Sequence, residues 1–282
     1  MMRYTIVTPT KNEAPYIEKT IFSVINQQVL PEEWLIMDDG STDETAAIIQ
    51  KHAAIHPFIK YFHLNNYRPE LVNTGGRVAA IINHGDTLRE KPIDIIVKLD
   101  ADTSFQPDFF LNLMNEFTQD EKLGGASGHL CTDGVPEKIT DRRGCRGATL
   151  LIRYTCFEQI GKFYVSKTRG EDVLAGVAIR AIGYKTGTFD YYFDHLKPEG
   201  IRASKPINHY ITGYYKGSVP YWLPFFLATI IRDFGKKPYV IGGFMALFAY
   251  ILSRYIHRYR PFPSFVTAQM RMEQQKKLLK KQ

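Results

Sequence analysis

Several features that would point to an exported or membrane-spanning chain are missing from this 282-residue sequence. It has only three cysteines, Cys131, Cys145 and Cys156, and this odd number without metal-type spacing predicts neither a disulfide framework nor a zinc site. The N-terminus has no charged-then-apolar signal peptide, so export is not expected. Charged residues make up 23% and hydrophobic residues 44%, which argues against a mainly disordered, collagen-like or coiled-coil chain. We therefore expect a globular protein of a reducing compartment, the cytoplasm.

Acidic residues are scarce in one part of the chain only. Residues 201–282 hold 14 Lys and Arg but 2 Asp and Glu, a balance of +12. Subtracting these from the totals of 36 and 29 leaves 22 basic and 27 acidic residues, a balance of −5, for residues 1–200. We therefore divide the chain into a body, residues 1–200, and a basic, aromatic tail, residues 201–282, and we expect the two parts to have different tasks.

Long apolar runs are also missing from the tail. A helix that spans a membrane needs about 20 apolar residues. The two apolar segments of the tail, residues 219–231 and 239–253, are shorter than that. Their aromatic and basic surroundings favour helices that lie on a membrane surface, with anionic lipid as the partner. The alternatives are a helix pair packed as ordinary core and a positive face that is simply solvated. We expect the protein to be peripheral on the cytoplasmic face of the membrane.

The body alternates between strand and helix patterns. Apolar residues at helical spacing separate short β-rich or buried runs, and the strands are expected at residues 4–8, 34–37, 58–64 and 93–99. Helices are expected at residues 15–28, 41–52, with Ser41 and Asp43 as caps, and 76–88. After residue 124 the strands become shorter, and another helix is expected at 173–182. This order predicts an α/β fold, with a mainly parallel sheet covered by helices on both faces.

An Asp-x-Asp motif follows the fourth of these strands. In parallel α/β sheets, ligands bind beyond the carboxyl ends of the strands. Asp100 and Asp102 lie at such an end, where residues i and i+2 point to the same side. Two carboxylates on one side attract a hard divalent cation, and Mg²⁺ or Mn²⁺ bridging a diphosphate would complete the site. A solvated acidic turn is the alternative.

Two further acidic pairs occur at expected element ends. Asp38 and Asp39 follow the second strand, where a carboxylate can accept hydrogen bonds from a base N–H or from sugar hydroxyls. Glu171 and Asp172 begin the helix at 173–182, whose positive end keeps a carboxylate ionised, as a general base requires. Helix capping is the alternative explanation for each pair.

Two basic side chains are additional candidates. Arg77 lies at the expected start of the third helix, where a diphosphate would meet both the helix end and the guanidinium. His195 lies just past the last strand of the body, where it would be a further metal or phosphate ligand. A surface arginine behind a turn and a structural histidine are the corresponding alternatives.

In combination, these motifs resemble those of the family 2 glycosyltransferases. The resemblance covers roughly residues 3–190 and includes the order and the intervals of the motifs, which are Thr8-Pro9-Thr10-Lys11-Asn12-Glu13, Asp38-Asp39-Gly40-Ser41-Thr42-Asp43, Asp100-Ala101-Asp102 and Gly170-Glu171-Asp172. It implies a GT-A (Rossmann-like) fold. It also implies an inverting, metal-dependent transfer of a sugar from a nucleotide-diphosphate sugar, by default a UDP-sugar, with Mn²⁺ or Mg²⁺ as cofactor.

The resemblance further implies a role for most of the candidate residues. The nucleotide sugar would be bound by residues at the strand ends and in the first turn, namely Thr8, Pro9, Glu13, Asp38, Asp39 and Asp100. Asp102 would bind the metal. Arg77 as a nucleotide-sugar ligand and His195 as a metal ligand are added from their positions in the chain and not from the resemblance. Asp172 would be the base that deprotonates an acceptor hydroxyl, supported by Glu171, while the metal neutralises the departing diphosphate.

The sequence departs from the processive members of that family. Those members carry a Gln-x-x-Arg-Trp signature and several membrane spans, whereas Trp34 and Trp222 are the only tryptophans here and lie in other contexts. The departure favours transfer of one sugar to a lipid-linked or saccharide acceptor at the membrane face. It disfavours a synthase that extrudes a long polymer.

Two other classes of protein stay open on the sequence alone. A nucleotidyltransferase would be expected to have a basic, glycine-rich triphosphate loop, but residues 8–13 contain no glycine and only one basic residue, Lys11. A non-catalytic nucleic-acid binder would fit the basic tail, but no nucleic-acid-binding motif is recognisable. We therefore expect no nucleic-acid partner.

Overall fold

The computed structural model describes residues 2–65, 67, 76–132, 134–165, 170–197, 206–233, 240–256 and 262–279. The chain divides into two compact units. We call the first the sheet unit; it comprises residues 1–70, 77–163 and 171–198. We call the second the helical unit; it consists mainly of the residues from 199 onward.

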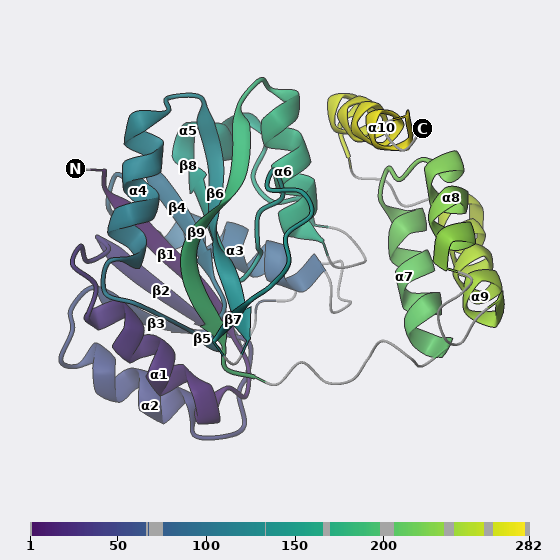
Figure 1. Ribbon diagram of the computed structural model, residues 1–282. Coiled ribbons are helices and arrows are strands. Elements are labelled where there is room, and N and C mark those ends of the chain that lie inside the picture. The colour runs from purple at the N-terminus through teal and green to yellow at the C-terminus, as the bar shows by residue number, and fades with distance from the viewer. Residues whose placement is uncertain are drawn as a thin grey trace. The chain divides into compact units, whose positions relative to one another are not determined.

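A mixed β-sheet forms the centre of the sheet unit (Figure 1). Its strand order is β3-β2-β1-β4-β8-β6-β9-β5, and β7 pairs with β6. The strands are β1 (Tyr4–Thr10), β2 (Glu33–Asp38), β3 (Ile59–His63), β4 (Ile95–Leu99), β5 (Thr103–Phe105), β6 (Leu123–Thr132), β7 (Val135–Pro136), β8 (Thr149–Arg153) and β9 (Lys185–His195).

The sheet is parallel in its first half and mixed in its second half. The pairs β1–β2, β1–β4 and β2–β3 are parallel, whereas β4–β8, β6–β8 and β5–β9 are antiparallel. The expectation of a mainly parallel sheet is therefore wrong beyond β4. Parallel neighbours need a crossover connection, usually a helix, and the described part of the connection between β6 and β8 contains none. β8 therefore returns in the opposite direction, between β6 and β4.

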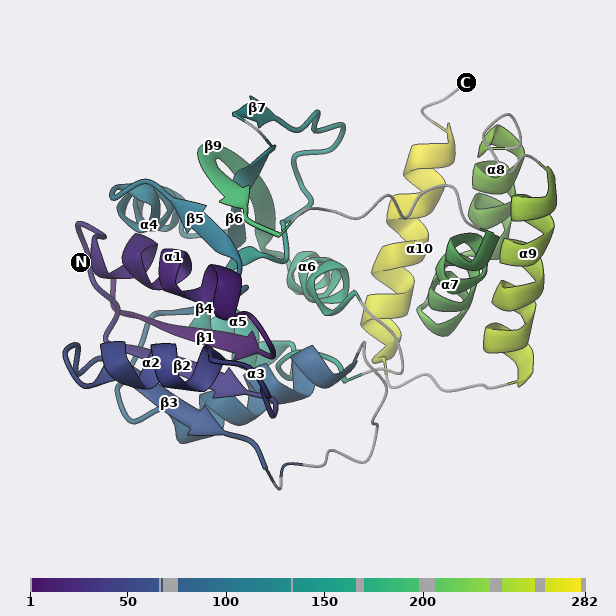
Figure 2. The same cartoon turned by 90° about the horizontal axis from the view of Figure 1, so that it is seen from below.

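Helices cover both faces of the sheet, as expected. On one face, α1 (Ala14–Ile25), α2 (Thr45–Ala53) and α4 (Phe109–Gln119) share a buried core with β1, β2 and β4. On the other face lie α3 (Gly76–Leu88), α5 (Tyr154–Gln159) and α6 (Glu171–Ala181). Gly124 of β6 lies so close to Ile179 of α6 and Cys156 of α5 that a Cβ would not fit there. In Figure 2, α1 and α4 are seen on one side of the strands and α3 on the other.

One edge of the sheet collects the carboxyl ends of β1, β2, β4 and β9. The first three are parallel neighbours, and β9 is parallel to β6, which like β4 runs opposite to β8. Thr10, Asp38, Leu99 and His195 therefore mark the same edge. The polar motifs singled out in the sequence follow these strand ends, so the fold places them along this edge.

The loops after β1 and β2 are tied to each other by side-chain hydrogen bonds. The Ser41 hydroxyl donates to Asp38 Oδ1 (2.6 Å) and accepts the Asn12 backbone N–H (2.9 Å). Asp43 accepts the Thr45 N–H at the start of α2 (3.1 Å) and the Ala14 N–H at the start of α1 (3.3 Å). Asp43 thus serves both helix starts. The expectation that Ser41 caps α2 is wrong, because its hydroxyl joins the two loops instead.

The helical unit contains α7 (Pro206–Ser218), α8 (Leu223–Asp233), α9 (Val240–Ile251), the π-helical turn η1 (Leu252–Ile256) and α10 (Ser264–Leu279). α7 and α9 are in close contact, because Gly213 and Gly217 of α7 lie against the backbone of Ala246 and Tyr250 and leave no room for a Cβ. Phe226 of α8 stacks on Tyr250 in a small core. Within the described ranges, no helix has both the length and the apolar character needed to cross a membrane.

Candidate active site

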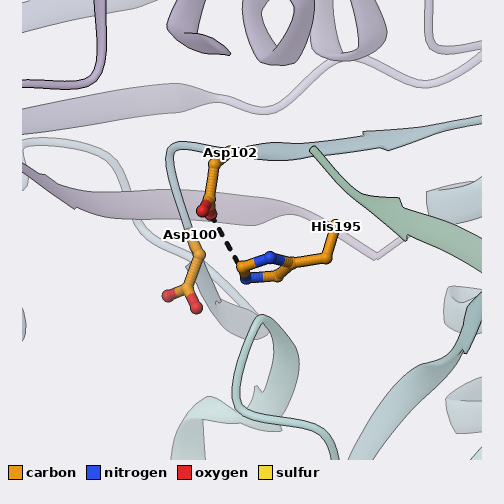
Figure 3. Close-up of side chains that lie close together, drawn as sticks. All are labelled: Asp100, Asp102 and His195. Atoms are coloured by element: carbon orange, nitrogen blue, oxygen red, sulfur yellow. Dashed lines mark ion pairs between the residues drawn. The ribbon is translucent and has the colours of Figure 1, made fainter. Parts of the chain in front are cut away.

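The site begins with three side chains gathered where β4, β5 and β9 meet. Asp100 follows β4, Asp102 precedes β5, and His195 ends β9. The antiparallel pairing of β5 with β9 sets Thr103 opposite His195, which brings the imidazole Nε2 to 3.5 Å from Asp102 Oδ1 (Figure 3). Each of the three residues offers one ligand atom, and these atoms lie within 4.8 Å of one another. This spacing can accommodate a single metal ion.

Asp102 is held in surroundings that disfavour its charge. Only 9% of its side chain is exposed. Burial raises the pKa of Asp102, and the neighbouring carboxyls of Asp100 and Glu13 raise it further, while His195 and Lys197 act in the opposite direction. A bound cation would supply the missing positive charge, so the electrostatics fit a divalent metal. Carboxylate and imidazole donors together suit Mn²⁺ and, with water ligands added, Mg²⁺.

A buried lysine lies beside this group. Lys98 of β4 donates from Nζ to Asp100 Oδ1 (2.7 Å) and to the Gly147 carbonyl (2.6 Å), and its Nζ lies 3.9 Å from Glu171 Oε1. Burial alone would lower the pKa of Lys98, but the carboxylates of Asp100, Glu171 and Asp172 raise it above the usual lysine value. The lysine is therefore an ammonium surrounded by carboxylates.

Glu171 and Asp172 occupy the first turn of α6, as the sequence predicted. Burial raises the pKa of Glu171, with Asp172 adding to the effect and Lys98 opposing it. Asp172 packs against Gly147, where the position of a Cβ would be 2.7 Å from Asp172 Oδ2. Gly147 is therefore needed as a glycine, because any side chain would displace the Asp172 carboxylate.

Two of the residues assigned to the nucleotide already have internal partners at the end of β2. Asp38 is fully buried and accepts hydrogen bonds from the Ser41 N–H (2.8 Å), the Ser41 hydroxyl and the Tyr61 hydroxyl (2.8 Å). Asp39 is bound by the Arg77 guanidinium through two hydrogen bonds. Asp38 is thus hydrogen-bonded within the protein, and Asp39 is paired with Arg77.

The residues assigned to the nucleotide at the end of β1 differ in their surroundings. The Thr8 hydroxyl is buried and accepts the Trp34 indole N–H (2.9 Å), and Pro9 follows it in β1 as a partly exposed residue. Glu13 Oε1 accepts a hydrogen bond from Lys197 Nζ (2.8 Å). Lys197 was not identified from the sequence, although its position two residues after His195 was the available signal.

Several buried polar side-chain atoms lack a hydrogen-bond partner within the described part of the chain, and two of them belong to charged side chains of the sheet unit. They are Glu13 Oε2 and one terminal nitrogen of Arg77. Buried polar atoms are normally satisfied, so an orphaned acceptor and an orphaned donor are places where a ligand can bind. Both atoms belong to residues that the sequence analysis assigned to the nucleotide.

Comparisons with known proteins agree with this geometry. The glycosyl transferase family 2 model matches residues 5–165, more than half of the chain. Chondroitin synthase of Escherichia coli is 30% identical over 162 residues, which are 54% of this chain and 22% of that protein. The poly-beta-1,6-N-acetyl-D-glucosamine synthase of Staphylococcus epidermidis is 30% identical over 180 residues, 61% of this chain and 39% of that protein. The chain thus spans well under half the length of these relatives.

Solved structures support the fold. A mannosyltransferase from Pyrobaculum calidifontis, in complex with GDP-Man and Mn²⁺, aligns with a TM-score of 0.59 and 20% identity, covering 96% of this chain and 73% of that chain. Residues 1–349 of TarS from S. aureus, in complex with UDP-GlcNAc, align with a TM-score of 0.55 and 15% identity, covering 77% and 66%. The fold is that of the GT-A-like glycosyltransferases, and the class of enzyme is a glycosyltransferase. The chain belongs to glycosyl transferase family 2.

Proposed function

We propose that this chain transfers a sugar from a nucleotide-diphosphate sugar to an acceptor hydroxyl, with inversion at the anomeric carbon and with a divalent metal. The observation that carries the proposal is that two groups of acidic side chains lie together at one edge of the sheet. Asp100 and Asp102, with His195, form a set of metal-type ligands, and Glu171 and Asp172 form an acidic helix start that Lys98 links to Asp100. A metal-assisted displacement needs both groups in one site.

The nucleotide diphosphate would bind where the loops after β1 and β2 are tied together. Glu13, Asp39 and Arg77 lie there, and the unpartnered atoms of Glu13 and Arg77 are available to hydroxyl and phosphate groups. The guanidinium matches the geometry of phosphate oxygens. The solved neighbours were obtained with GDP-Man and with UDP-GlcNAc, so both a guanine and a uracil nucleotide are candidates, and UDP remains our default.

The metal would be held by Asp102 and His195, with Asp100 beside them facing the metal or the ribose. Mn²⁺ or Mg²⁺ bound there would neutralise the charge that develops on the departing diphosphate. The surrounding protein would hold these ligands in place. Asp102 is buried, and the pairing of β5 with β9 keeps His195 Nε2 at 3.5 Å from its carboxylate.

Asp172 would act as the general base. Its carboxylate lies in the first turn of α6, against Gly147. In this role it accepts the proton of the acceptor hydroxyl, whose oxygen attacks the anomeric carbon while the bond to the diphosphate breaks. One displacement inverts the configuration. Glu171, whose pKa burial raises, would support the base or hydrogen-bond the acceptor.

The acceptor would be a saccharide or a lipid-linked saccharide at a membrane surface. The relatives named above are a chondroitin synthase and a poly-N-acetylglucosamine synthase, which supports a saccharide-type acceptor. In the helical unit, one face of α9 exposes Ile241, Phe244, Phe248 and Ile251, with exposed fractions between 44% and 65%. We call this face the α9 stripe.

The charge of the tail makes an anionic membrane the proposed partner of the α9 stripe. Apolar residues at this spacing lie on one face of a helix, and residues 201–282 carry a balance of +12. Basic residues near an anionic leaflet add roughly 1 kcal/mol each, a contribution that salt screens, whereas the insertion of aromatic rings is not screened. The protein would then be peripheral on the cytoplasmic face.

The donor can be identified by ligand-induced stabilisation. The protein would be heated with UDP, GDP and other nucleoside diphosphates, each with Mn²⁺, with Mg²⁺ and with EDTA. We expect one nucleotide to raise the melting temperature strongly, and only with the metal present. The matching nucleotide sugars would then be incubated with saccharide and lipid-linked acceptors. A protein that no nucleoside diphosphate stabilises under any of these conditions would contradict the proposal.

A further inference from the structure

Lys98 lies in a place where a lysine is costly. It is in the middle of the sheet, on a strand whose other residues are apolar, and only 4% of its side chain is exposed. An ammonium taken out of water destabilises the fold unless several partners compensate it. A buried aliphatic side chain would serve the sheet better, so the reason for this lysine must be sought in its partners.

The partners of Lys98 come from three separate elements. Asp100 follows the same strand, Gly147 lies in the connection before β8, and Glu171 opens α6. Gly147 is also the residue against which Asp172 packs. Through its Nζ atom, Lys98 therefore contacts Asp100, the carboxylate on the donor side. The same atom contacts the two segments next to Asp172, which are the connection that contains Gly147 and the first turn of α6.

We propose that Lys98 is a positioning residue that fixes the first turn of α6 against the carboxyl end of β4, and so sets the separation between Asp172 and the donor-side carboxylates. This proposal rests on the proposed function. The Lys98 ammonium lies between the carboxylates of Asp100 and Glu171, at 2.7 Å from Asp100 Oδ1 and 3.9 Å from Glu171 Oε1. Without that charge they repel one another, and the first turn of α6 moves away from β4. Reacting groups displaced by about 1 Å can lose a factor of 10² in rate.

The role of Lys98 differs from that of a metal ligand. The lysine hydrogen-bonds Asp100 Oδ1, so only the second oxygen of that carboxylate would be available to a bound metal. Removing the lysine frees an oxygen of Asp100 and removes a positive charge from the neighbourhood of the metal. Metal binding should therefore persist or become tighter in the same variant that loses turnover. A variant whose site had collapsed would lose both.

The test compares three variants of the whole chain. Lys98→Met keeps the length and the apolar stem of the side chain, and Lys98→Arg keeps the charge. Lys60→Met is the matched control, because Lys60 of β3 also joins two carboxylates, those of Glu33 at the start of β2 (2.7 Å) and Glu90 in the loop after α3 (2.8 Å). The measurements are kcat and KM with UDP- and GDP-sugars, and calorimetric titration with Mn²⁺ in the presence of UDP or GDP.

We expect Lys98→Met to lower kcat by about 10- to 100-fold with a smaller change in the donor KM. Lys98→Arg should recover part of this loss, Lys60→Met should keep the wild-type kcat, and Lys98→Met should keep Mn²⁺ binding. A kcat of Lys98→Met equal to that of Lys60→Met would overturn the proposal, as would joint loss of turnover and Mn²⁺ binding. In both cases an active wild-type protein leaves the proposed function standing. A wild-type protein without turnover and without Mn²⁺-dependent nucleotide binding would overturn both.

Discussion

The sheet unit and the helical unit use apolar side chains in opposite ways. The sheet unit buries large ones, such as Trp34, Phe109 and Phe157, between the sheet and its helices. The helical unit has a small core around Phe226 and Tyr250, and it leaves the α9 stripe exposed. Contiguous exposed apolar surface marks an interaction site more often than a free surface. The sheet unit thus gathers polar side chains at one edge, whereas the helical unit exposes an apolar face, for which we propose a membrane as the partner.

Mutations can test this difference between the sheet unit and the helical unit. If chemistry belongs to the sheet unit and attachment to the helical unit, then substitutions at the polar edge change turnover or metal binding and leave lipid binding intact. Substitutions in the α9 stripe change lipid binding and leave turnover and metal binding intact. A substitution in one unit that changes both properties by similar factors would contradict this division.

The largest effect is expected for Asp172→Asn. The amide keeps the size of the side chain and its place beside Gly147, but it cannot accept a proton. Loss of a general base lowers the rate by about 10²- to 10⁴-fold. Sugar transfer measured at saturating donor should fall by this range, while nucleotide binding and the melting temperature are retained.

The control for this experiment is Asp120→Asn. Asp120 lies at the end of α4, and its half-exposed carboxylate forms an ion pair with Lys185. That variant should transfer sugar at the wild-type rate. An Asp172→Asn protein that also keeps the wild-type rate would show that Asp172 is not the base.

The next largest effect is expected for Asp102→Ala. Without this carboxylate, the metal would lose its most buried ligand. Nucleoside diphosphate affinity in Mn²⁺ should fall by at least about tenfold, toward the value that the wild-type protein has in EDTA. Calorimetry in Mn²⁺ and in EDTA measures both values, and equal affinities of the wild-type protein in the two buffers would refute metal-dependent binding.

A smaller effect is expected from the α9 stripe. Replacing both Phe244 and Phe248, which are each more than 60% exposed, by Ser should weaken binding to anionic vesicles without lowering the melting temperature. Each ring that enters the interface contributes at most about 1.5–3 kcal/mol. Vesicle flotation is the measurement, and high salt should release the wild-type protein only in part. Absence of the wild-type protein from the lipid fraction would exclude the membrane as partner.

The smallest effect is expected for Asp102→Asn in metal-free buffer. Because burial raises the pKa of Asp102, its ionised form destabilises the folded state at neutral pH, and this cost disappears as the pH falls through the raised pKa. The variant should therefore melt at a higher temperature than the wild type in EDTA at neutral pH, by no more than about 4 °C. The difference should shrink on acidification, and Mn²⁺ should reverse it. A lower melting temperature of the variant in EDTA would contradict this explanation.

Local elements were predictable where the hydrophobic pattern is regular. The helix expected at residues 76–88 is found at Gly76–Leu88, and the acidic pair Glu171 and Asp172 opens a helix as expected. Residues 109–119 were not assigned, although they form α4. The apolar run of that segment was a usable signal for a helix.

The sequence alone determined which polar motifs follow which strands, because a strand or helix is specified by the spacing of neighbouring apolar residues. This was enough to indicate the enzyme family and to single out Asp100, Asp102 and Asp172. Only the tertiary structure decided that β9 returns beside β5 and brings His195 to Asp102, and that α6 brings Glu171 to Lys98. These contacts join residues tens of positions apart in the chain. They depend on strand pairing and helix packing between distant segments, which local periodicity does not specify.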